Sequence, residues 1–146
     1  MKQKWMILFF LLLLASPISY AQDKFTISGE VGFFEEGNVF IYLYTQDKYE
    51  AGIRPPIFQV IEPNDEQKQA SKVQFKFESF PAGSYAIFAW LDVNRDGKLN
   101  QTETGRALEP VGVYRPSTIW LWPWDTIKFD LNENLGGVFI LLQRIY

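Results

Sequence analysis

The sequence has 146 residues, no cysteine, no histidine and a formal net charge of −3. Without these two residue types it has no disulfide, no thiol nucleophile, no Ser-His-Asp triad and no zinc site of the usual kind. The acidic balance, with no basic cluster, argues against a nucleic-acid partner and against binding to anionic lipid.

Residues 1–21 are typical of a secretory signal peptide. Two lysines precede an unbroken apolar run at residues 7–14, and Ser19 and Ala21 stand at the −3 and −1 positions of a cleavage site. The run is too short to span a bilayer, and no cysteine follows it for lipid attachment. We therefore expect residues 22–146 to form a single exported domain, secreted or periplasmic, without membrane insertion once the leader is removed.

Short apolar stretches, several of them alternating with polar residues, predict a series of short β-strands in the remainder. In chain order these strands lie near residues 25–31, 39–44, 57–61, 73–78, 85–91, 127–131 and 138–142. Turn residues separate them, and the chain shows no sustained helical period, although residues 62–72 are compatible with one short helix. The pattern predicts an all-β fold, an antiparallel β-sandwich of about seven or eight strands, with the wholly apolar residues 85–91 as a central strand.

A small outer-membrane β-barrel is the alternative architecture, because the chain is expected to be exported and ends in an aromatic residue, Tyr146. Such barrels need strands of about ten residues with a polar face toward the lumen. Most of the predicted strands are shorter, and residues 85–91 have no polar face. The sandwich is therefore the favoured prediction.

Residues 92–103, DVNRDGKLNQTE, have the ligand spacing of an EF-hand calcium loop. A polar hairpin loop is the alternative, because Asp, Asn and Gly are common in turns. Gly97 at position 6, the apolar Leu99 at position 8 and a carboxylate at position 12 favour calcium. Since a strand precedes the loop, the pattern predicts a structural calcium ion on a β-protein. The expected ligands are Asp92, Asn94, Asp96, the Lys98 carbonyl, Asn100 and Glu103.

The segment FESFPAGSYAIFAWLDVNRDGKLNQTETGRALEPVGVY, residues 77–114, resembles the centre of the DUF2141 family of small exported bacterial proteins. The matching residues are Pro81, Gly83, Tyr85, Asp92, Asn94, Asp96, Gly97, Gly105 and residues 109–112. Two positions depart from the family pattern: Leu91 replaces a usual His, and Arg106-Ala107 replace a usual Ile-Pro. The resemblance implies a β-sandwich similar to transthyretin or to carboxypeptidase regulatory domains, and it implies no enzymatic activity.

Three tryptophans, Trp120, Trp122 and Trp124, form a second candidate site. Exposed aromatic side chains bind sugars or peptides by stacking, but packing of these rings over the end of the sandwich is the favoured interpretation, because 17 % of the residues are aromatic. No motif locates a catalytic residue, and the acids of the loop are better explained as calcium ligands than as a hydrolytic pair. We therefore expect a non-enzymatic calcium-binding module of the cell envelope, with an unidentified protein or glycan partner. A carbohydrate- or peptide-binding module is the alternative function.

Overall fold

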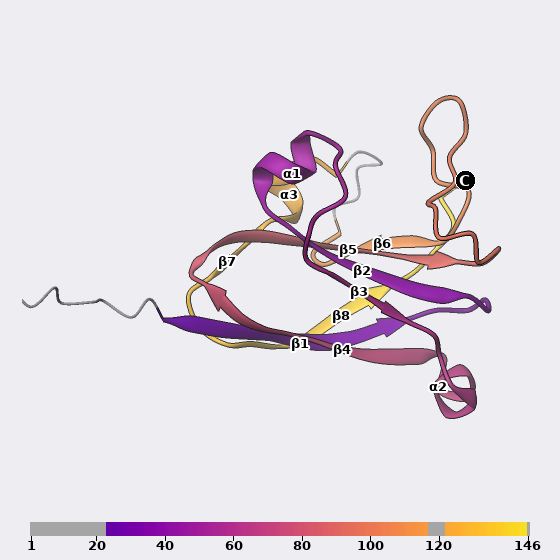
Figure 1. The fold of residues 1–146 in the computed structure, drawn as a ribbon, viewed down its shortest axis with the longest axis horizontal. Helices are drawn as coiled ribbons and strands as arrows, with labels where there is room; N and C mark the ends of the chain where they lie inside the picture. Colours follow the sequence, from indigo (N-terminus) through magenta and orange to yellow (C-terminus); the bar gives the residue numbers. More distant parts are fainter. Residues whose placement is uncertain (1–22, 117–121, 146) are drawn as a thin grey trace, which may run out of the picture.

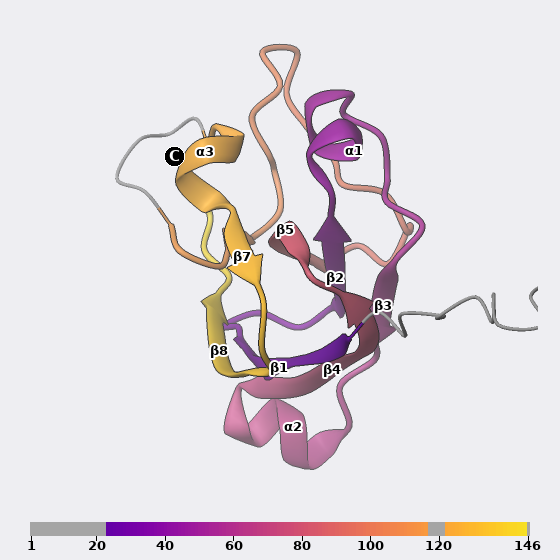
Figure 2. The same cartoon turned by 90° about the vertical axis from the view of Figure 1, so that its left-hand side faces the viewer.

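The structure, a computed structural model, describes residues 23–116 and 122–145. Its strands belong to two sheets that face each other, which confirms the predicted all-β sandwich (Figures 1 and 2). The strands are β1 (Lys24–Gly32), β2 (Asn38–Tyr44), β3 (Phe58–Ile61), β4 (Lys72–Pro81), β5 (Gly83–Asp92), β6 (Val111–Val113), β7 (Phe129–Leu131) and β8 (Leu135–Leu141). The helices are α1 (Gln46–Glu50), α2 (Asp65–Ala70) and α3 (Trp124–Ile127).

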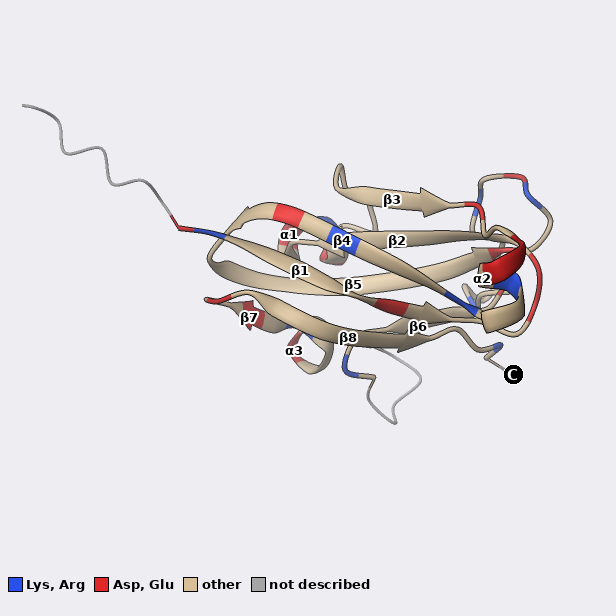
Figure 3. Ribbon diagram, turned by 90° about the horizontal axis from the view of Figure 1, so that it is seen from below, with Lys and Arg blue, Asp and Glu red and all other residues tan. Residues whose placement is uncertain are grey.

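One sheet has three strands in the order β4-β1-β8, and the other has the order β3-β2-β5-β6, with β7 also paired to β5. The period of two in the sequence explains the smaller sheet, since Val73, Phe75 and Phe77 of β4 are buried between the sheets. In Figure 3, charged residues gather mainly at the end of the sandwich that carries α2 and the loops, and most of each strand is uncharged.

Strand β5 is central, as its apolar sequence predicts, and it is covered on both faces. Ile87 and Leu91 point between the sheets and are fully buried. Trp90, on the outer face, is also fully buried and stacks on Phe40 of β2 with ring centroids 4.3 Å apart. Because loops cover this outer face, polar side chains at the end of β5 can be buried there as well.

Several details differ from the prediction, and the first is that β6 lies where no strand was expected. Strands β1 and β8 pair in parallel, although the rest of the pairing is antiparallel. Ile127 belongs to α3, so the strand expected at residues 127–131 is only Phe129–Leu131. The helix α1 lies in a stretch that shows no helical pattern. Helix α2 falls within residues 62–72, where a helix was compatible, and Asn64 and Gln67 form its capping box.

One side of the sandwich is closed by a bridge between Val111 of β6 and Gln143, which follows β8. Each of the two residues donates its N–H to the carbonyl of the other, at 3.0 Å. Gly112 allows this approach, because a Cβ at that position would meet the Leu141 carbonyl oxygen at 2.6 Å. No helix within the described ranges is long and apolar enough to cross a membrane.

Candidate functional site

The loop that begins at Asp92 rises from the end of β5, over the outer face of the larger sheet (Figure 1). Asp92 is 1 % exposed, and its carboxylate accepts hydrogen bonds from the backbone N–H groups of Asp96 (3.1 Å) and Gly97 (2.9 Å). Gly97 has a φ of +73°, a conformation that glycine adopts without strain. The chain therefore folds back so that its own amides face the Asp92 carboxylate.

A second buried carboxylate, Glu109, lies against the same loop from the chain that leads into β6. It is 5 % exposed, and its two oxygens accept the N–H groups of Val93 and Asn100, each at 3.1 Å. Asp92 and Glu109 are the buried charged side chains of the part of the chain that the structure describes. Glu109 thus fixes both ends of the segment 93–100.

Burial and hydrogen bonding shift the pKa values of Glu109 and Asp96 in opposite directions. Burial raises the pKa of the Glu109 carboxyl above its usual value of 4.5, its two backbone hydrogen bonds lower the pKa, and the negative charges of Asp92 and Asp96 raise it further. The exposed Asp96 has a lowered pKa, first because the Asn100 side chain donates to it. Of Glu109 and Asp96, Glu109 is therefore the acid whose charged form is disfavoured.

Asp92 has a polar neighbour on each side across the sheet. Asn38 is its direct partner in the pairing of β2 with β5, so the two side chains share the outer face. On the other side, the pairing of Trp90 with Val111 places Glu109 opposite Asp92 when the same register is continued. The Leu91 N–H, which donates to the Pro110 carbonyl at 2.9 Å, supports that continuation. Asn38, Asp92 and Glu109 therefore form a row across the end of the sheet, which we call the polar row.

The amide oxygen of Asn38 is buried and accepts no hydrogen bond from any described residue. The indole N–H of Trp90 is also buried and donates no hydrogen bond to any described residue. Trp90 lies two residues before Asp92, on the same face of the sheet. A buried polar atom without a partner is costly, so native proteins satisfy such atoms with water, an ion or a ligand. The Asn38 oxygen is thus an acceptor beside Asp92 that the protein itself leaves unused.

The side chains that follow Asp92 form a hydrogen-bonded loop. The Asp96 carboxylate accepts the Lys98 N–H (2.8 Å) and the side-chain amides of Asn94 (3.0 Å) and Asn100 (3.2 Å). The Asn100 amide also donates to the Lys98 carbonyl at 3.4 Å. The structure therefore gathers most of the expected calcium ligands, from Asp92 through Asn100, into one compact loop.

Glu103, the expected ligand at position 12, lies elsewhere. It is exposed at the tip of a turn that is closed by the hydrogen bond from the Gly105 N–H to the Thr102 carbonyl, at 2.9 Å. A bridge between Gln101 and Ala107 forms the base of this second hairpin, residues 101–107. Among the described residues, no three Asp or Glu side chains are arranged to hold one metal ion together, so Asp92 and Asp96 form no such group with Glu103 or with Glu109.

The tryptophan cluster is divided by the fold. Trp124 is 5 % exposed, and together with Ile127 it forms the buried face of α3, which packs into the core. Trp122 is half-buried, and its carbonyl accepts the hydroxyl hydrogen of Tyr49. Trp120 lies outside the described residues. Trp124 therefore follows the packing interpretation, whereas Trp122 lines a surface cavity.

Two residues of the site, Asn38 and Glu109, are absent from the expected ligand set. The sequence carries a weak signal for Glu109, which is a single acid directly before Pro110 and the apolar strand β6. Asn38 follows Gly37 at the start of a strand, where asparagine is common in turns, so the sequence gives no signal for its role in the site. Only the pairing of β2 with β5 places it beside Asp92.

Comparison with protein-family models matches residues 34–134 to a family described as an uncharacterized protein conserved in bacteria, DUF2141. The match includes the polar row, the loop with EF-hand spacing and the 101–107 hairpin. No curated protein and no solved structure matches this sequence. Because the family model covers more than half of the chain, the protein belongs to the DUF2141 family.

Proposed function

We propose that this protein is an exported module of the cell envelope that binds one structural calcium ion at the loop beginning with Asp92. The observation that carries the proposal is the polar row. Two buried carboxylates, Asp92 and Glu109, flank the loop, and the Asn38 oxygen beside them has no hydrogen-bond donor among the described residues. Carboxylate, amide and carbonyl oxygens are the ligands that calcium takes in proteins.

Electrostatics favours a cation at this place. Burial raises the pKa of Glu109, and the negative charges of Asp92 and Asp96 raise it further. A divalent cation reverses this effect, because it stabilises all of the negative charges at once. The existing N–H hydrogen bonds of Asp92 and Glu109 are compatible with such a cation, since each of these four carboxylate oxygens accepts one N–H group and keeps a second lone pair.

The proposed ligands are drawn from the loop and from one closing glutamate. The loop ligands are Asp92, Asn94, Asp96, the Lys98 carbonyl and Asn100. The spacing of the EF-hand pattern favours Glu103 as the closing ligand, whereas the position of Glu109 beside the loop favours Glu109. We favour Glu109, because Glu103 would have to move from the tip of a separate hairpin.

Isothermal titration of purified protein with calcium tests the proposal. We expect one site, with binding lost in Asp92→Asn and weakened at least about tenfold in Glu109→Gln, since each change removes a charged ligand. Glu103→Gln decides between the two closing residues, and Glu133→Gln, an exposed acid elsewhere, is the matched control. If wild-type protein takes up no heat-detectable calcium at millimolar concentration, the loop is a polar turn only.

The calcium ion is proposed to stabilise the fold and not to switch it, because helices that would swing open do not flank the loop in the described residues. The wider role is binding or scaffolding outside the cytoplasm, without enzymatic activity, after removal of residues 1–21. A protein or glycan is the expected partner. The likeness to transthyretin-like and carboxypeptidase-regulatory-like sandwiches also remains a proposal, which the two facing sheets support.

A further inference from the structure

A surface cavity of about 490 Å³ lies on the outer face of the larger sheet, beside the 101–107 hairpin. Its volume falls in the range of about 300 to 1,000 Å³ that is usual for small-molecule sites. None of its lining residues belongs to the proposed calcium ligands or to the polar row. The cavity therefore adjoins the proposed calcium loop through Leu99 but shares no ligand with it.

The interior of the cavity is apolar and partly aromatic. Phe88 and Val111 contribute from strands β5 and β6, and Leu99 and Ile145 contribute from the loop and the last described residue. Trp122 forms one wall, with its ring edge-on to Phe88 at a centroid distance of 6.2 Å. Such a lining binds the apolar body of a ligand by excluding water.

The mouth of the cavity is polar and carries a positive charge. Gln101, Thr104 and Arg106 of the hairpin line it and are exposed. The Arg106 guanidinium makes no ion pair or hydrogen bond with any residue in the ranges 23–116 and 122–145. By contrast, Arg54 lies over the Phe58 ring at 4.0 Å, and Arg144 pairs with Glu35.

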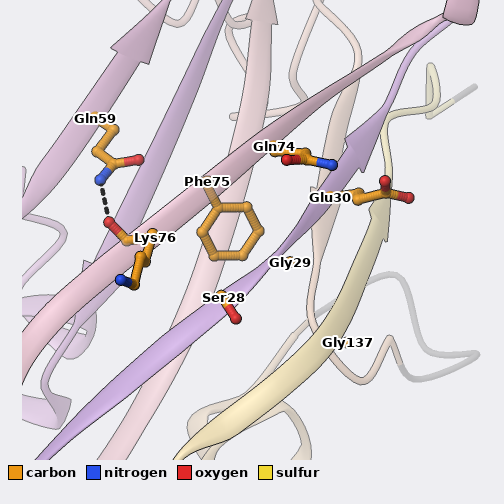
Figure 4. A pocket seen from close by; sticks show the side chains of 8 residues that line it. All are labelled: Ser28, Gly29, Glu30, Gln59, Gln74, Phe75, Lys76 and Gly137. Atoms are coloured by element: carbon orange, nitrogen blue, oxygen red, sulfur yellow. Dashed lines mark hydrogen bonds between the residues drawn. The ribbon is translucent and has the colours of Figure 1, made fainter.

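A second cavity, of about 540 Å³, lies over the smaller sheet and offers a useful contrast (Figure 4). Its charged side chains already have partners, because Glu30 pairs with Lys72, and Lys76 pairs with Glu78. Its other polar lining residues include Gln59, whose side chain donates to the Lys76 carbonyl. The cavity beside the hairpin is thus distinguished by an apolar interior and by a charge at its mouth, Arg106, that has no partner in the described part of the chain.

We propose that the cavity beside the 101–107 hairpin binds a small carboxylate with an apolar body. The apolar body lies against Phe88, Val111 and Trp122, and the carboxylate pairs with Arg106 at the mouth. A planar guanidinium is well suited to this, since it can donate two parallel hydrogen bonds to one carboxylate.

Decanoate, below its micelle concentration, is the test ligand, and decanol and cellobiose are the comparisons. Calorimetry in calcium-containing buffer should show decanoate binding to one site, decanol binding about tenfold more weakly, and no binding of cellobiose. Arg106→Gln should weaken decanoate binding about tenfold and leave decanol unchanged. Arg95→Gln, which removes an exposed arginine that does not line the cavity, is the matched control and should have no effect.

Filling the cavity gives a second test that does not depend on charge. Ala107→Phe should weaken both decanoate and decanol binding, and if that variant fails to fold, Thr104→Phe at the exposed mouth replaces it. Decanoate binding that survives Arg106→Gln unchanged would overturn the proposal. So would a protein that binds cellobiose but not decanoate, because the cavity would then be a sugar site built on Trp122.

Discussion

Asp92 and Glu109 bind one loop between them, and each carboxylate accepts two backbone N–H groups of that loop. Asp92 holds the early part of the loop, at Asp96 and Gly97, and Glu109 holds its ends, at Val93 and Asn100. Both acids are almost fully buried. The loop is therefore ordered by two anions, which makes their removal informative with or without a metal ion.

Asp92→Ala should destabilise the protein even in the presence of a chelator. The substitution leaves the Gly97 N–H, which is partly buried, without its acceptor, and it leaves the Asp96 N–H with the Asn94 side-chain oxygen alone. We expect a loss of about 2 kcal/mol in the free energy of unfolding, measured by urea denaturation. Glu103→Ala is the control and should change the free energy by less than about 0.5 kcal/mol, because Glu103 is exposed. Equal stability of the two variants would contradict the assigned role of Asp92.

Calcium should raise the thermal stability of the protein, if the proposed site is correct. A ligand at about 100 times its dissociation constant stabilises the folded state by roughly 2.7 kcal/mol. Magnesium should replace calcium poorly, because it needs a smaller and more regular octahedron of ligands. Thermal melts in calcium, magnesium and chelator measure the effect, and Asp92→Asn should melt alike in all three solutions. A wild-type melting temperature that does not respond to calcium would count against the site.

The pH dependence of stability should carry a contribution from Glu109. Its folded pKa is raised above 4.5, chiefly by burial, so the folded state holds this proton more tightly than the unfolded chain does. Stability from this group is therefore full below pH 4.5 and falls as the pH rises through the folded pKa. In the absence of calcium, the free energy of unfolding of Glu109→Gln should not show this decrease with rising pH. Urea denaturation between about pH 4 and 7 would measure it. An unchanged profile in the variant would show that Glu109 ionises without cost.

Gly37→Ala should disturb the polar row without touching any of its side chains. A Cβ at this position would lie 2.5 Å from the Asp92 carbonyl oxygen and 2.9 Å from its carbon, so backbone would have to move. We expect a loss of more than about 2 kcal/mol in stability, together with weaker calcium binding. Gly136→Ala is the matched control, since its Cβ would meet only the Ser28 hydroxyl at 3.9 Å. A Gly37→Ala protein as stable as the control would contradict this packing.

Much of the fold could be predicted because side-chain alternation reports burial directly. Val73, Phe75 and Phe77 mark β4 in this way, and the apolar run of β5 marks a strand covered on both faces. Ile127 was wrongly assigned to a strand, since a helix of four residues, Trp124–Ile127, is too short to show a period. The parallel pairing of β1 with β8 also escaped prediction, because the alternation of a strand does not reveal the direction of its neighbour.

The candidate site could be located from sequence but not completed. Spacing identifies the loop from Asp92 to Asn100, since all of its oxygens come from one short segment. The carboxylate that closes the loop depends on where the chain turns next, and the Gln101–Ala107 bridge carries Glu103 away while Glu109 returns. Asn38 comes from another strand, so only the sheet register relates it to the loop.

Arg144 links the turn before β2 to Leu108, the residue before Glu109. Its guanidinium donates to both carboxylate oxygens of Glu35 and to the Leu108 carbonyl. Glu35→Gln should cost about 0.5 kcal/mol at neutral pH, because the pair is partly exposed. The hydrogen bond from Arg144 lowers the pKa of Glu35, so this stability is present above pH 4.5 and is lost as the pH falls through the lowered value. Denaturation at pH 7 should therefore separate the variant from wild type, and the difference should shrink as the pH is lowered below 4.5.

The parallel pairing of β1 with β8 also constrains the order in which the molecule can fold. The Thr26 N–H donates to the Asn134 side chain, 108 positions further along the chain, and the register continues from there to Leu141. Contacts between such distant segments form slowly, since the long intervening loop must first be closed. During synthesis the smaller sheet therefore stays incomplete, with one side of β1 unpaired, until the residues of β8 have emerged.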